Sequence, residues 1–142
     1  MTKSFTVSSS KRQELIDITE EVEKAVSESK TKQGICFVFV PHSTTALVLT
    51  ENEEGLKRDW IKFLNRLVES KDFSAKGGPA SGWEHNRIDD NADSHILAGI
   101  LGQGKVLPIE NGKLQRGTWQ QIFLVELDGP KERKVIVKII KE

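Results

Sequence analysis

The run "TWQQIFLVELDGPKERKVIVKII", residues 118–140, decides the fold class. Residues 118–127 are rich in β-branched and aromatic side chains, and residues 133–140 alternate apolar with polar ones, as a half-buried strand does. The intervening "DGP" is a turn sequence. This part of the chain is therefore predicted to form two β-strands joined by a turn.

Further strands are predicted toward the N-terminus. The segment "ICFVFV" is apolar without alternation, which is typical of a strand buried on both faces, and "TTALVLT" is a β-branched run. An Asn-Gly pair predicts another tight turn after "KVLPIE". These strands are expected at residues 4–10, 13–19, 35–40, 44–50 and 105–110.

Helices are predicted between the strands. Thr19 has the character of an N-cap for a first helix that ends near Gly34, and Asn52 has that of a cap for a second. A third helix, through "HILAGILG", ends at Gly102. The apolar stripe of the second comprises Leu56, Trp60, Phe63, Leu64 and Leu67. Residues 71–84, rich in Gly and Ser, are predicted to be a loop, and the mixed order of elements indicates a single α+β domain over residues 1–142.

The amino-acid composition limits the classes of partner that the protein can be expected to bind. The 21 basic and 21 acidic residues cancel, so the net charge gives no reason to expect a nucleic-acid partner. The one cysteine, Cys36, lies in an apolar run and is expected to be a buried apolar residue rather than a reactive thiol or part of a disulfide framework. No window approaches the roughly 18 apolar residues of a membrane span. We expect a cytoplasmic protein without membrane association.

The stretch "RIDDNADSH", residues 87–95, concentrates polar side chains just before an apolar run. His95 ends it, and the other histidines, His42 and His85, also stand at predicted element ends. For any one histidine a structural role is an equally good explanation. Three of them with intervening carboxylates favour a site for zinc or another divalent metal, although the spacing matches no standard signature.

The third helix has two different faces on a helical wheel. One arc, expected to face the core, carries Ile96, Leu97, Ile100 and Leu101. His95 lies on the opposite side among short side chains, so that face is expected to contact a ligand or a second subunit. Strand 118–127, apolar on both sides, is expected to need the same cover. Either Asp89 or Asp90 is predicted to cap the helix, and Asp93 to support the cap or the helix dipole.

Two more segments carry candidate chemistry. "PHSTT", residues 41–45, offers hydroxyls and backbone amides beside His42 for an anion, although a plain strand start explains the threonines equally well. Glu51 could act as a base or as a helix-start carboxylate. The chain has neither a P-loop nor a nucleophile elbow.

The motifs "PHSTTALVLTENEE", "DDNADSHILAGILG" and "VLPIENGKLQRGTWQQIFLVELDGP", with the closing "ERKVIV", resemble the YjbQ family, known as secondary thiamine-phosphate synthase enzymes. The likeness covers nearly the whole chain. It implies a compact α+β subunit with a mixed, largely antiparallel sheet or sandwich flanked by helices, a homotrimer, and a polar pocket whose histidines hold a metal ion, zinc or magnesium.

The resemblance also implies a set of site residues and a reaction. The metal ligands would be His42, His85 and His95, and the catalytic residues would be His42, which thus belongs to both sets, with Glu51, Asn91, Asp93 and Gln120. The chain departs from the family pattern at Gly104 and Lys131. The implied reaction joins a pyrimidine methyl pyrophosphate to a thiazole phosphate and forms thiamine phosphate. The expected partner is therefore a small phosphate-bearing metabolite. A metal-dependent hydrolase and a non-enzymatic, trimeric metal- or metabolite-binding protein are the alternatives.

Overall fold

The computed structural model describes residues 1–69 and 82–142, which form eight strands, three α-helices and one 3₁₀ helix. Every predicted strand is present with slightly shifted ends. Most of the predicted loop 71–84 lies outside the described residues. In chain order the elements are β1 (Thr2–Ser8), β2 (Glu14–Asp17), α1 (Thr19–Ser29), β3 (Gln33–Phe39), β4 (Thr45–Thr50), α2 (Glu54–Val68), η1 (Glu84–Arg87), α3 (Ala92–Leu101), β5 (Gly104–Glu110), β6 (Lys113–Leu114), β7 (Gln121–Glu126) and β8 (Glu132–Lys141).

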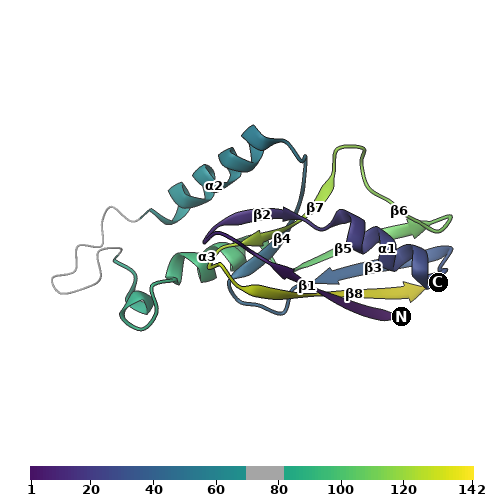
Figure 1. Cartoon of the computed structure of the whole chain (residues 1–142), viewed down its shortest axis with the longest axis horizontal. Coiled ribbons are helices and arrows are strands. Elements are labelled where there is room, and N and C mark those ends of the chain that lie inside the picture. The colour runs from purple at the N-terminus through teal and green to yellow at the C-terminus, as the bar shows by residue number, and fades with distance from the viewer. Residues whose placement is uncertain (70–81) are drawn as a thin grey trace.

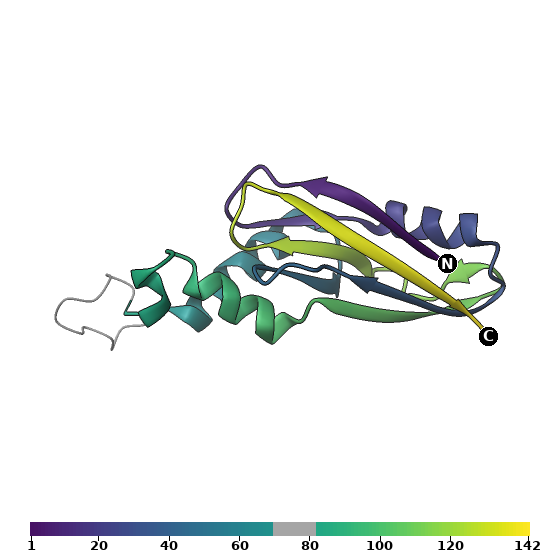
Figure 2. The ribbon, with the colours of Figure 1, turned by 90° about the horizontal axis from the view of Figure 1, so that it is seen from below.

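The strands form two antiparallel sheets, which confirms the α+β class. The larger has the order β1-β8-β3-β5-β6 and the smaller the order β2-β7-β4. All pairings between the described strands are antiparallel. Helix α1 lies beside the chain ends, whereas α2 and α3 lie at the other end of the molecule (Figures 1 and 2). No helix in the described part of the chain is long and apolar enough to cross a membrane.

Strand β7 is covered on both faces within the chain. Ile122 and Leu124 pack into the core shared with the larger sheet and α1, while Phe123 and Val125 pack into a second core under α2 and α3. Residues 122–127 are all buried. The expectation that this strand needs cover from another subunit is therefore wrong, because the two layers on either side supply it.

Helix α3 turns a different face to the sheet than the wheel predicted. Ile96 is 36% exposed and Ile100 is 64% exposed, so the predicted core arc is wrong at both positions. The helix lies against β4. Small side chains allow its backbone to approach the sheet closely. Both arcs of this helix carry apolar side chains, and the charged Asp93 lies on the predicted core arc, so apolar character alone could not distinguish them. The buried positions are Ala92, Ser94, Leu97 and Ala98.

The helix ends differ from the predicted ones by a residue or more. Asp17 Oδ1 accepts from the backbone N–H of Thr19, so Thr19 is the first helical residue of α1 rather than its cap. Glu53, not Asn52, caps α2 through the N–H groups of residues 55 and 56. The first helix ends at Ser29, well before Gly34, which lies in β3.

The predicted apolar stripe of α2 is only partly buried. Leu64 and Val68 are its buried residues, but Phe63 is 56% exposed and Leu67 is 51% exposed. Helix α2 therefore keeps an exposed apolar edge. Cys36 is buried as predicted, and burial raises the pKa of its thiol to about 11.

Candidate functional site

Polar side chains from four segments meet at the end of the molecule that carries α3. The segments are the β1–β2 turn, residues 42–44, residues 85–95 and the connection from β7 to β8. Thr44 O accepts from the N–H of Leu127, and Ser94 Oγ donates to Leu127 O. These bonds hold the loop before β4, the start of α3 and the end of β7 side by side.

A hydrogen-bonded chain runs through the centre of this cluster. Lys131 Nζ lies 2.8 Å from Asp128 Oδ2, which accepts from Asn91 Nδ2 at 3.0 Å. Asn91 Oδ1 lies 2.9 Å from His85 Nε2, and the ring of His85 meets that of His95 edge-on with centroids 5.0 Å apart. Desolvation alone would raise the pKa of Asp128, but the bonds from Lys131 and Asn91 outweigh it and lower that pKa. Asp128 is thus a carboxylate.

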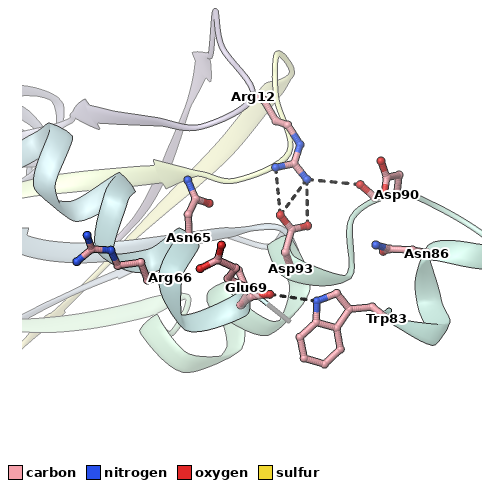
Figure 3. A pocket seen from close by; sticks show the side chains of 9 residues that line it. Arg12, Asn65, Arg66, Glu69, Trp83, Asn86, Asp90 and Asp93 are labelled. Carbon is pink, nitrogen blue, oxygen red and sulfur yellow. Dashed lines mark hydrogen bonds and ion pairs between the residues drawn. The ribbon is translucent and has the colours of Figure 1, made fainter. Parts of the chain in front are cut away.

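Asp93 is engaged by an arginine rather than free. Arg12 Nη1 and Nη2 donate to its carboxylate at 3.0–3.1 Å, and Nη2 lies 3.4 Å from Asp90 O. The hydrogen bond to Asp93 raises the pKa of Arg12. A cavity of about 580 Å³ opens beside this pair, between the end of α2, Trp83 and the start of α3 (Figure 3).

The start of α3 is capped by neither Asp89 nor Asp90. Asn86 Oδ1 accepts from the N–H of Ala92 at 2.9 Å, and Asn91 occupies the N-cap position without a side-chain cap bond. The cap therefore comes from η1. This leaves the side chain of Asn91 available to link His85 and Asp128.

A buried ion pair between Glu126 and Arg133 stabilises the strands and loops that carry the cluster. Glu126 has no exposed surface and Arg133 is 5% exposed; Arg133 Nε and Nη2 donate to Glu126 at 2.9 and 2.7 Å. Ser9 Oγ donates to Glu126 Oε1, and Arg133 Nη2 also donates to Thr44 Oγ1. Burial alone would raise the pKa of Glu126, but the bonds from Arg133 and Ser9 lower it. The pair fixes the β7–β8 connection and the loop before β4 together.

Gly129 leaves room for this network. A Cβ there would lie 2.6 Å from Ser9 Oγ and 2.8 Å from Glu126 Cγ. We expect Gly129→Ala to destabilise the protein by about 1–3 kcal/mol through overpacking. At Gly99 of α3 nothing lies within 4 Å of an added Cβ, so Gly99→Ala should stabilise by about 0.5–1 kcal/mol. Urea denaturation measures both, and equal midpoints would contradict the packing argument.

His42 has a different hydrogen-bond partner from His85. Its Nε2 accepts from the backbone N–H of Lys134 at 2.8 Å. Burial lowers the pKa of His42, and the charge of Arg133 acts in the same direction. His42 is therefore tied to the start of β8, while His85 and His95 face each other.

Two of the predicted site residues lie at the opposite end of the β4–β7 ladder. Thr45 pairs with Glu126 at the end near the histidines, and Thr50 pairs with Gln121 at the other. Five residue steps along the strand, about 17 Å, separate these pairs. Glu51 and Gln120 follow and precede the far pair, and Gln120 Oε1 accepts from Gly117 N. Within one chain, neither can reach the histidines.

The spacing of the His85 and His95 rings is compatible with a shared metal ion. Two imidazoles bound to one tetrahedral metal at about 2.0–2.1 Å have centroids roughly 5 Å apart, which agrees with the 5.0 Å between His85 and His95. Within residues 1–69 and 82–142 of a single chain, no three or more His, Cys, Asp or Glu side chains are grouped so as to hold a metal. One chain thus offers a pair of candidate ligands, and the predicted set of three histidines does not form in it.

Three of the residues that organise the cluster were missed by sequence reasoning. Asp128 was assigned to a turn only, and Arg12 and Glu126 were given no role. The signal for Glu126 is an acid in a run of apolar strand residues, "IFLVEL", because a carboxylate there is buried unless the strand ends. The partner of Arg12 could not be found in this way, since 81 residues separate it from Asp93.

Two antiparallel sheets with a polar histidine cluster at one end define a class of small α+β proteins. The chain belongs to the YjbQ-like family, because the sequence model of the family "UPF0047 protein YjbQ-like" matches residues 3–142. A UPF0047 protein of Archaeoglobus fulgidus is 44% identical over 136 residues, covering 96% of this chain and 98% of that protein.

Solved structures agree with this family assignment. The crystal structure of a YbjQ-like protein of unknown function from Sulfolobus solfataricus has a TM-score of 0.90 and 45% identity, covering 100% of this chain and 97% of that one. A hypothetical protein from Aeropyrum pernix has a TM-score of 0.89 and 38% identity, covering 100% and 99%.

Proposed function

We propose that this chain is a metal-assisted enzyme acting on a phosphate-bearing metabolite at the histidine cluster. The observation that carries the proposal is the edge-on pair of His85 and His95, oriented by Asn91 and the Asp128 carboxylate. Structural histidines do not need such a chain of oriented partners, whereas metal ligands and general bases do. The family resemblance supplies the reaction, formation of thiamine phosphate.

In that reaction the thiazole nitrogen attacks the pyrimidine methylene, the carbon–oxygen bond breaks, and pyrophosphate leaves with the bonding electrons. A bound divalent metal would offset the charge of the departing pyrophosphate. His85 and His95 would hold the metal. Lys131 and Arg12, each shared with a carboxylate, would position phosphate oxygens at the edge of the site.

The proposal includes a second chain in the site. A zinc site usually has three protein ligands, and one chain offers two suitable imidazoles. Glu51 is exposed at the far end of β4, where a neighbouring subunit in a cyclic assembly could receive it. Exposed apolar side chains support such an assembly, which the family resemblance implies is a trimer. They include Ile100 on α3, Val106 on β5 and Ile140 on β8.

The function is tested with purified protein, both substrates and Mg²⁺ or Zn²⁺. Thiamine phosphate should form, and a chelator should abolish it. If phosphate esters are hydrolysed instead, the hydrolase alternative replaces the proposal. Metal binding with no turnover of any substrate would favour the non-enzymatic alternative.

The shared site is tested by mixing inactive variants. His95→Ala chains and Glu51→Ala chains are each expected to be inactive alone. If neighbouring chains share each site, an unfolded and co-refolded equal mixture should regain about a quarter of the wild-type activity, because each half of a site is intact with even odds. Mixtures without refolding serve as the control. No recovery after subunit exchange, verified by mass spectrometry, would contradict a site that is shared between neighbouring chains.

A further inference from the structure

We infer that His85 and His42 are held in opposite tautomers, so that His85 presents an unprotonated Nδ1 as ligand or base, while His42 presents an Nδ1–H donor and takes no part in metal binding. This inference rests on the proposed function for the chemistry of the site, but the tautomers themselves follow from the hydrogen bonds. They are therefore testable without any activity.

The tautomer of His85 is set by the Asp128 carboxylate, which acts through the side chain of Asn91. Asp128 carries its charge beside Lys131 and can only accept, so the group of Asn91 that lies 3.0 Å from it is the amide NH₂. The carbonyl oxygen of Asn91 then faces His85 Nε2 at 2.9 Å. An acceptor in this position requires a proton on Nε2. In the neutral ring, Nδ1 is left with its lone pair.

This is the arrangement that metal-binding histidines commonly show. The ring nitrogen that does not bind the metal donates to an oxygen, which fixes the ring and raises the basicity of the other nitrogen. Here a carboxamide oxygen does this, and the carboxamide is itself fixed by a carboxylate. Asn91 and Asp128 are therefore positioning residues that act through His85.

The tautomer of His42 is set by the backbone in the opposite sense. The N–H of Lys134 points at Nε2 from 2.8 Å, so Nε2 carries the lone pair and Nδ1 the proton. Neither side of this contact can shift easily. Lys134 follows the buried Arg133, whose Nη2 donates to Thr44 two residues after His42.

A metal on Nε2 of His42 would have to displace the Lys134 amide from a strand residue that is paired with Thr6 of β1. A metal on Nδ1 would require the proton to move to Nε2, against an N–H group. Both routes cost the hydrogen bond between the Lys134 amide and His42. The Nδ1–H of His42 instead suits an oxygen of a bound phosphate.

The experiment is nitrogen-15 NMR of histidine-labelled protein at about pH 8, above the ordinary imidazole pKa of about 6.5. Single His→Gln variants assign the three rings. His85 should show the Nε2–H form and His42 the Nδ1–H form. Added Zn²⁺ should shift Nδ1 of His85 and leave His42 unchanged. The same tautomer in both rings, or a zinc shift at His42 equal to that at His85, would overturn the inference.

A matched pair of variants tests the positioning residues. Asp128→Asn removes the charge that orients Asn91, so His85 should become a mixture of tautomers and Zn²⁺ affinity should fall by about 10–100-fold. Asp90→Asn, an exposed carboxylate in the same region, should change neither. An unchanged His85 spectrum in folded Asp128→Asn protein would overturn the role of Asp128. Failure of the proposed reaction would leave the tautomer spectra as expected, so the two outcomes are distinguishable.

Discussion

His95→Ala is expected to lower kcat/KM for thiamine phosphate formation by about 100-fold or more, the range for loss of a group that transfers protons or holds a catalytic metal. The ring lies against His85 rather than in a hydrophobic core. Alanine is also the best helix former, so α3 should persist. A large loss of activity with little change in the free energy of unfolding is therefore expected.

The control for this prediction is Asp89→Asn, which changes an exposed carboxylate in the same stretch. Its kcat/KM should stay within about twofold of the wild-type value, since isolated surface changes have small effects. Steady-state rates and thermal melts are measured on the same preparations. If His95→Ala retained more than half of the wild-type activity, the histidine pair would not be the reaction site.

Arg133→Ala is expected to destabilise the protein by about 3–5 kcal/mol, because it leaves the Glu126 carboxylate buried without its ion partner. Glu126 has no exposed surface, so water cannot replace the lost hydrogen bonds. The thermal midpoint should fall accordingly. Lys134→Ala, an exposed neighbour in β8, should change the free energy of unfolding by less than about 0.5 kcal/mol.

The same ion pair predicts how stability responds to acid. The folded-state pKa of Glu126 is lowered, despite the opposing effect of burial, by its bonds to Arg133 and Ser9. Its contribution to stability is therefore fully present above the unfolded pKa of about 4.3 and is lost as the pH falls through the folded value. Urea midpoints measured between pH 7 and pH 3 should fall less steeply for Glu126→Gln than for the wild type. Parallel curves would contradict this assignment.

The sequence predicted the strands well, because alternation and β-branched runs report local structure directly. Residues 133–140 lie in β8, and the unbroken apolar run at 35–40 largely coincides with β3. The expected burial of β3 on both faces is wrong, because only Cys36 and Val38 of this strand are buried and Ile35 is 40% exposed. It also predicted that polar residues near the start of the third helix would gather. His85, Asn91 and His95 do so because they lie within eleven residues of one another, where a short connection keeps them close.

The helix faces and the membership of the site were beyond the sequence. Both arcs of α3 carry apolar side chains, and only its packing against β4 selects the one bearing Ala98. Glu51 and Gln120 were predicted to join His42 and the other histidines. Their strand register places them at the other end of the ladder, because pairing of residues 45–50 with 121–126 runs antiparallel.

What the sequence by itself determined is therefore the class of fold, the family and the local clustering around His85 and His95. Only the tertiary structure decided that Asp128, Arg12 and Lys134 are the partners of Asn91, Asp93 and His42. The physical reason is range. Secondary structure follows from the spacing of side chains a few residues apart, whereas a proton on one imidazole nitrogen depends on a single donor or acceptor brought within about 3 Å by strands from distant parts of the chain.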